Sequence, residues 1–226
     1  MRRFTTMLSV VIAATAVSFS AECSPRQDGS DRTLRLDYIF SGDNRHTEIS
    51  LDELSCFEGW AGRCVNLDSV PLKGNGQLVI TALSDGRTLY RNSFSTLYQE
   101  WQATEEAVCV RRSFENVFLA PMPAEKALVR IELYGYRGEI NASFGHIVDP
   151  EDILIRRLPK SVAPHRMLLQ SGPAGECIDI AIVAEGYTAA EAELFYADAK
   201  LAMDEILSYE PFASCRDRFN FIAVAL

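Results

Sequence analysis

The C-terminal stretch of the chain, residues 177–226, constrains the fold most, because two short apolar runs flank a segment with helical periodicity. The runs are residues 177–184, followed by Gly186, and residues 219–226, and each suits a buried strand. Between them, Thr188 and Glu191 form a capping box that predicts the start of a helix, which Pro211 ends. Apolar residues recur at helical spacing in this segment: Ala192, Phe195, Ala199, Ala202, Met203 and Ile206. The pattern predicts a β-α-β unit, the usual opening of an α/β domain.

One β-α-β unit cannot cover both faces of its own sheet. We therefore expect residues 176–226 to be the truncated start of a larger domain, and the chain to be the N-terminal piece of a longer protein.

Upstream, residues 31–158 carry a β pattern. Residues 34–40 begin with strict alternation, and turn signals at residues 84–86 and 135–138 mark two hairpins. Residues 96–108 suit a short helix or an irregular crossover, and residues 153–158 suit an edge strand. Short strands at this spacing predict an all-β sandwich. Residues 159–175 contain three prolines and two glycines, which predicts a linker between the sandwich and the C-terminal domain.

Residues 1–21 have the three-part pattern of a signal peptide. Arg2 and Arg3 precede an apolar stretch that is too short to span a bilayer, and Ser18 and Ser20 are small residues placed for cleavage. We expect an exported protein, whether periplasmic, outer-membrane-associated or secreted. Cys23 leaves a lipid anchor open as an alternative, although Glu22 suits lipidation poorly. The net charge of −9 argues against nucleic acid as a partner.

The six cysteines show no regular spacing and no C-x-x-C pair, so neither a zinc cluster nor a disulfide framework is predicted. Cys56 and Cys64 flank a turn and could bridge in an oxidising compartment. We favour the alternative that both are free, small apolar residues.

No metal ligands or catalytic residues are predicted in this chain. Its three histidines, His46, His146 and His165, lie far apart in the sequence, and each is expected on the surface or in a loop. Residues 73–76 (KGNG) resemble a phosphate loop, but no Lys-Ser/Thr pair follows, so a turn between strands is expected.

Two further features allow a binding interpretation, but the sequence identifies no binding residue. Trp60, with Tyr90 or Tyr98, could bind sugar or peptide, although a Trp in the sandwich core is favoured. Glu185-Gly186-Tyr187 follows a predicted strand at the edge where open α/β sheets build their sites. A plain strand-to-helix turn is the favoured interpretation there.

Residues 178–188 (IDIAIVAEGYT) are similar to the start of the catalytic domain in the IgA-peptidase family of bacterial zinc metallopeptidases. Residues 195–199, 209–212 and 217–224 continue this similarity in order and spacing. Upstream, residues 60–63, 72–77 and 112–116 resemble the N-terminal domain of Bacteroides-type members, and residues 149–156 resemble the junction between the two domains.

The resemblance implies an exported zinc metallopeptidase that acts on protein or peptide substrates, with an N-terminal β-sandwich and a zincin-like catalytic domain. Zinc is expected in the full-length protein and not in this chain, because the family's H-E-x-x-H signature is absent from the sequence. The chain alone is therefore expected to be inactive. The alternative is a non-enzymatic cell-surface module that binds protein or glycan.

Overall fold

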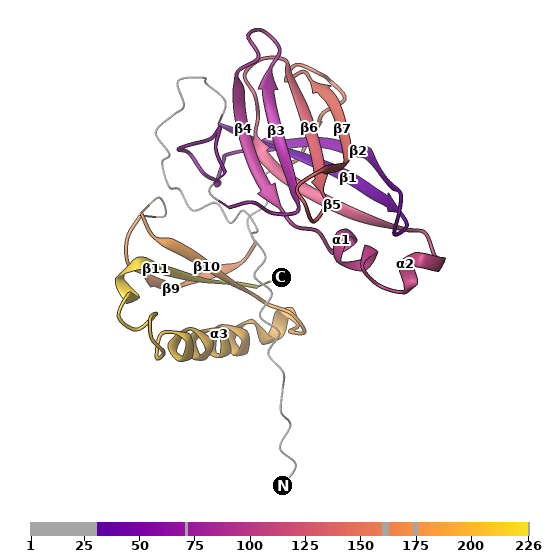
Figure 1. Cartoon of the computed structure of the whole chain (residues 1–226). Coiled ribbons are helices and arrows are strands. Elements are labelled where there is room, and N and C mark those ends of the chain that lie inside the picture. Colours follow the sequence, from indigo (N-terminus) through magenta and orange to yellow (C-terminus); the bar gives the residue numbers. More distant parts are fainter. Residues whose placement is uncertain (1–30, 71, 160–162, 174–175, 226) are drawn as a thin grey trace. The chain divides into compact units, whose positions relative to one another are not determined.

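In the computed structural model of this chain, residues 31–70, 72–159, 163–173 and 176–225 are described. They fall into two compact, strand-rich units that divide between residues 160 and 161 (Figure 1). The expected leader, residues 1–21, and Cys23 lie outside the described residues. No helix in the described ranges is long and apolar enough to cross a membrane.

The N-terminal unit contains two four-stranded sheets. The first sheet has the order β5-β1-β2-β8 and the second has the order β4-β3-β6-β7. The strands of the first sheet are β1 (Arg32–Gly42), β2 (Thr47–Glu58), β5 (Arg112–Pro121) and β8 (Arg156–Arg157). Those of the second sheet are β3 (Gly76–Ala82), β4 (Thr88–Phe94), β6 (Ala127–Tyr134) and β7 (Ile140–Val148). All pairs are antiparallel except the short contact of β2 with β8, which is parallel.

The alternation along β1 places every second side chain in one shared core. Leu34, Leu36, Tyr38 and Phe40 are all 0% exposed. They belong to the same cluster as the alternating residues of β3 and β6 in the second sheet: Leu78, Ile80, Val129, Ile131 and Leu133. Burial of this apolar surface is the main force that holds the two sheets together.

Two short helices, α1 (Leu97–Gln102) and α2 (Glu106–Cys109), connect β4 with β5, where the sequence predicts a short helix or crossover. The Thr96 hydroxyl caps α1 by accepting a hydrogen bond from the Gln99 N–H at 3.2 Å. Tyr98 and Trp101 are buried and join α1 to the core.

The C-terminal unit is a three-stranded sheet of order β10-β11-β9, with one helix on its face (Figure 1). Strands β10 (Ile178–Val183) and β11 (Phe219–Val224) are parallel, and α3 (Ala192–Ile206) lies between them in the chain. Phe195, Ala199 and Met203 of α3 are buried, in agreement with the predicted apolar stripe.

Strand β9 (His165–Gln170) differs from the prediction, because it lies inside the expected linker 159–175. It pairs antiparallel with β11, from His165 opposite Val224 to Gln170 opposite Asn220. The segment has no alternating pattern of its own. It becomes a strand because the edge of β11 that faces away from β10 offers unpaired N–H and C=O groups.

The capping box that precedes α3 is present. The carboxylate of Glu191 accepts hydrogen bonds from the N–H and the hydroxyl of Thr188, at 2.9 and 2.7 Å. The 3₁₀ turn η1 (Ala189–Glu191) forms the entry to the helix. The helix ends at Ile206, before Pro211, and a second 3₁₀ turn, η2 (Arg216–Arg218), leads into β11.

Candidate functional site

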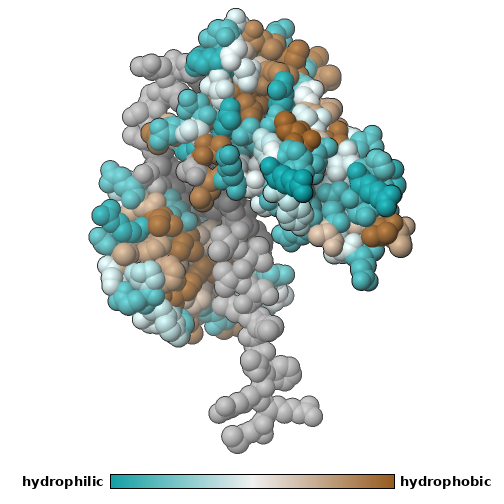
Figure 2. Space-filling model, viewed as in Figure 1, coloured by the Kyte–Doolittle hydropathy of each residue, from teal (hydrophilic) through white to brown (hydrophobic). Residues whose placement is uncertain are grey.

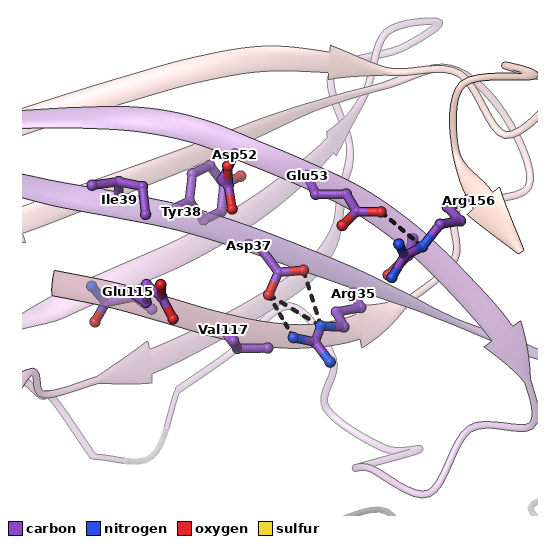
Figure 3. Close-up of a pocket in the computed structure, with 11 residues that line it drawn as sticks. Arg35, Asp37, Tyr38, Ile39, Asp52, Glu53, Glu115, Val117 and Arg156 are labelled. Atoms are coloured by element: carbon purple, nitrogen blue, oxygen red, sulfur yellow. Dashed lines mark hydrogen bonds and ion pairs between the residues drawn. The ribbon is translucent and has the colours of Figure 1, made fainter. Parts of the chain in front are cut away.

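A hollow of about 200 Å³ lies on the outer face of the first sheet (Figure 3). Its floor is β1, where Arg35, Asp37 and Ile39 alternate with the buried core residues. Side chains of β2, β5 and β8 complete the lining: Asp52, Glu53, Ser55, Glu115, Asn116, Val117 and Arg156. None of these residues was predicted to be functional. The charged residues at alternate positions of β1 could have indicated that this face of the sheet is polar.

A β-bulge brings an extra carboxylate to this face. In the pairing of β1 with β2, Asp37 lies opposite Glu53 and the next residue, Tyr38, lies opposite Leu51. Asp52 is therefore the unpaired extra residue of β2. Because two residues of β2 oppose one of β1 here, Asp52 and Glu53 both line the hollow although they are adjacent in sequence.

Two ion pairs bind the central charges. Arg35 donates to Asp37 from Nη2 to Oδ1 at 2.8 Å and from Nε to Oδ2 at 2.9 Å. The hydrogen bond to Asp37 raises the pKa of Arg35 further. At the other end, Nε of Arg156 lies 2.9 Å from Oε1 of Glu53. Two of the four carboxylates are thus held by guanidinium groups (Figure 3).

Charged side chains of both signs line this hollow. Its lining contains no histidine or cysteine. Ser55 lies opposite Arg35 of β1 and Arg156 of β8, whose guanidinium groups stay protonated and cannot accept the proton of its hydroxyl. A second hollow of about 560 Å³ lies between the 64–68 loop, β4 and residues 121–125. It combines apolar walls from Leu67, Leu89 and Met122 with charges from Asp68, Arg87 and Glu125, and it also lacks histidine.

The structure does not bring the three histidines together into a set of metal ligands. His46 lies in the exposed turn after β1, with its N–H 2.9 Å from Oδ1 of Asp43. His165 is exposed at the start of β9, with Nδ1 2.9 Å from the carbonyl oxygen of Ala163. Across the described ranges, no three His, Cys, Asp or Glu side chains are placed to hold a metal ion.

His146 departs from the expectation of a surface or loop position. It lies on β7 and points into the sandwich, where its Nε2 is 2.7 Å from the hydroxyl of Tyr38. Burial lowers its pKa. Residues 142, 144, 146 and 148 alternate toward the core, so the position follows from the register of β7.

The aromatic group around Trp60 is part of the core and not an exposed platform. The Trp60 ring packs edge-to-face on Tyr90 at 5.9 Å, and its Nε1 donates to the carbonyl of Arg63 at 3.0 Å. Tyr98 is 0% exposed and donates to the carbonyl of Ser41 at 3.0 Å. The favoured interpretation of Trp60 as a core residue is thus correct.

The residues 73–76 form a turn that enters β3, as predicted. A side chain at Gly74 would meet the carbonyl oxygen of Phe94 at 2.1 Å, so the tight approach requires glycine there. The Asn75 carbonyl accepts hydrogen bonds from the N–H of Tyr134 at 2.8 Å and from Nε2 of Gln99 at 2.9 Å. These contacts give the turn a structural role.

Glu185, Gly186 and Tyr187 form the turn between β10 and α3. Gly186 has a φ of +80°, which glycine adopts without strain. The Tyr187 hydroxyl donates to Oδ2 of Asp198 at 2.9 Å, and its ring packs on Phe195 at 5.3 Å. The hydrogen bond to Asp198 raises the pKa of Tyr187. Glu185 is exposed. The turn therefore anchors the start of α3.

The cysteines correct one further expectation. Cys56 is buried and free, as favoured, but Cys64 is disulfide-bonded. A bridge between Cys56 and Cys64 is therefore wrong, and so is the expectation of a free Cys64. Sequence spacing fails here because a disulfide depends on the distance between the two residues in the fold.

A family model described as Peptidase M64 N-terminus matches residues 27–145, and one described as IgA Peptidase M64 matches residues 167–226. These matches define the chain as a peptidase-related protein. It belongs to the peptidase M64 family, which confirms the resemblance to IgA peptidases. No curated protein matches the chain.

Proposed function

We propose that this chain is the N-terminal portion of an exported zinc metallopeptidase that acts on protein or peptide substrates. The order of the two family matches carries this proposal. The N-terminus model covers the sandwich strands through most of β7, and the peptidase model begins in β9. The gap between the two matches contains the division between the two compact units.

In this proposal the C-terminal unit is the opening of a zincin-like catalytic domain. The parallel pair β10 and β11, with α3 between them, is the part of the arrangement that supports it. Strand β9 adds an antiparallel edge, so the sheet is already mixed.

The histidines of this chain do not fit a peptidase zinc site, which needs three protein ligands and an open position. Nε2 of His146 is engaged by Tyr38 inside the sandwich, and His46 and His165 each lie in a turn or strand start without a second histidine. We therefore propose that the zinc ligands belong to residues beyond the printed sequence, and that this chain alone is inactive.

Metal analysis of the purified chain after incubation with zinc, alongside a digest of casein or immunoglobulin, tests the proposal. We expect no stoichiometric zinc and no chelator-sensitive cleavage from this chain. A product of the same gene that continues past Leu226 into an H-E-x-x-H segment is expected to show both. This placement of the active site would be contradicted if the 226-residue chain bound one zinc ion tightly. Proteolysis by this chain that a chelator inhibits would also contradict it.

Export is supported by the disulfide at Cys64, because disulfides persist in oxidising compartments. N-terminal sequencing of protein from its native cell should begin at residue 21 or 22. A blocked terminus at a lipidated Cys23 would identify a lipoprotein, and an intact Met1 would refute export altogether.

A non-enzymatic binding module is the second candidate, and the larger hollow of the sandwich favours it. Its volume of about 560 Å³ lies in the size range of ligand sites, and its walls are mainly apolar with a few charges. Binding of glycan or protein by the printed chain, together with a natural stop codon after Leu226, would favour this candidate.

A further inference from the structure

A hydrogen bond between two side chains joins the two sheets of the sandwich at one edge. Tyr38 comes from β1 in the first sheet, and His146 comes from β7, the last strand of the second sheet. The Tyr38 hydroxyl lies 2.7 Å from Nε2 of His146, and Tyr38 is 0% exposed. The other ring nitrogen, Nδ1, is buried and has no hydrogen-bond partner among the described residues.

The surroundings of His146 are aromatic and apolar. Its ring lies 5.8 Å from the rings of both Tyr38 and Phe144. Val129 is its neighbour on β6, and Phe118 of β5 packs on the far side of Tyr38 at 6.0 Å.

Among the described residues, no Asp, Glu, Lys or Arg belongs to the buried core that His146 faces. The buried core residues of β2 are Ile49 and Cys56, and Tyr90 is that of β4. The buried titratable groups of this core, besides His146, are therefore Tyr38, Cys56, Tyr90 and Tyr98. None of the fully buried polar side chains in the described ranges is an Asp, Glu, Lys or Arg. A charge on His146 would therefore have no counter-ion within the core.

The hydrogen bond depends on the protonation state of the imidazole. This dependence requires the neutral tautomer in which Nε2 accepts the Tyr38 O–H and the ring proton resides on Nδ1. When a proton adds to Nε2, that nitrogen becomes a donor. It can then only donate to the Tyr38 oxygen, so the Tyr38 O–H proton is left without an acceptor. The ring also carries a positive charge among apolar groups.

We propose that His146 is an acid-sensitive latch that holds the edge strand β7 against the first sheet and releases it when the ring is protonated. Strand β7 suits this role because it pairs with β6 alone within its sheet. Its outward-facing residues Asn141, Ser143, Gly145 and Ile147 are exposed. Loss of the contact between His146 and Tyr38 therefore loosens the strand without requiring the central strands to part.

The direction of the pH effect follows from burial, which lowers the pKa of His146, against a smaller opposing effect of the Ile147 backbone. The unfolded chain, with a histidine pKa of about 6.5, then binds more protons than the folded chain just below that pH. The stabilising effect is complete above the unfolded pKa, and it is lost as the pH falls from there to the folded pKa.

Urea unfolding of the full chain between about pH 7.5 and pH 5.5 tests the latch, because histidine titrates in that range and ordinary carboxylates do not. In the wild type we expect the folding equilibrium constant of the sandwich to fall, at most by about tenfold per pH unit, the limit for one proton. The variant His146→Gln keeps an acceptor for Tyr38 and cannot be protonated, so its stability should be nearly independent of pH. The control His46→Gln, at an exposed turn, should keep the wild-type pH dependence.

Two further measurements keep the test decisive if His146→Gln folds poorly. Titration of the His146 ring by NMR in the wild type should give a pKa below that of an unfolded peptide. Hydrogen exchange, corrected for its intrinsic pH dependence, should show residues 140–148 losing protection at the lower pH before residues 127–134. A normal or raised pKa, or equal protection changes in β6 and β7, would overturn the latch. The same pH dependence in His146→Gln as in the wild type would also overturn it.

Discussion

Strands β1 and β11 are the central or near-central strands of their sheets, yet they bury their side chains in different ways. In β1, buried residues alternate with half-exposed ones, and the second set forms the charged floor of the hollow in Figure 3. In β11, all six residues are buried. An alternating strand has one face toward water, whereas a continuous apolar run indicates a strand that is buried on both faces. The spacing of buried residues along a strand therefore indicates whether one or both of its faces are covered.

Both units bury few polar side chains and keep their charged residues outside. In the sandwich, charged residues stay on the outer faces, and Figure 2 shows hydrophilic and hydrophobic side chains interspersed on the visible side. In the C-terminal unit, the amide of Asn220 is 1% exposed within β11. The sandwich buries the small hydroxyl residues Thr33, Ser55 and Thr96 beside a large apolar core. The smaller sheet buries one amide, with several hydrogen bonds, beside two small apolar clusters.

The strongest test of the comparison is a pair of adjacent substitutions in β11. Phe221→Ala and Ile222→Ala should destabilise the protein by about 3–5 and about 2–5 kcal/mol, because Phe221 is 0% and Ile222 is 3% exposed. The matched pair in β1 should differ: Leu36→Ala costs about 2–5 kcal/mol and Ile39→Ala much less, since Ile39 lies on the outer face. Hydrogen exchange of the peptides of each unit measures both pairs. A small effect of Ile222→Ala would break the comparison.

Asn220→Ala is expected to destabilise the C-terminal unit by about 1–3 kcal/mol, because it removes the buried amide that hydrogen-bonds β11 to residues 171–172 and to Asp179. Its Oδ1 accepts from the Ser171 N–H at 2.8 Å, and its Nδ2 donates to the Gly172 carbonyl at 3.0 Å and to Oδ1 of Asp179 at 2.8 Å. Denaturant titration followed by exchange of residues 163–173 measures the loss. Asn116→Ala on β5, where the side chain bonds one carbonyl at 3.0 Å, is the control and should cost less.

The smallest expected effect concerns the helix caps, which both units use. Thr188→Ala removes the hydroxyl of the capping box and should cost about 1 kcal/mol, while Thr188→Ser should restore most of it. Thr96→Ala at the start of α1 should cost about as much. Chemical denaturation of the three variants compares the caps. Equal stability of the alanine and serine variants at residue 188 would show that the box contributes nothing.

Several features were within reach of the sequence. The alternation of residues 34–40 gave β1, the apolar runs gave β10 and β11, and the pair Thr188 and Glu191 gave the entry to α3. These features are local, because the spacing of apolar side chains and the residues that cap a helix can be recognised within a few consecutive positions. The inward position of His146 could also have been predicted, because it lies two residues from Phe144 and from Val148 and so shares their face of β7.

Other features had no local signal. Strand β9 forms because β11 offers it an edge. The edge strand expected within residues 153–158 is present as the two-residue β8, but its pairing with β2, which brings Arg156 to Glu53, had no local signal. The bulge at Asp52 depends on the register between two strands, which no single segment records.

The sequence by itself determined the two-part organisation, the family and the types of the main strands and of helix α3, because these follow from periodicity, punctuation and motif order along the chain. The tertiary structure alone decided which side chains meet. It paired Tyr38 with His146 across the sandwich, left Cys56 free, and gathered Arg35, Asp37, Glu53 and Arg156 on one face. Such contacts join residues from separate strands, and their distances are set by sheet register and packing, which only the complete fold fixes.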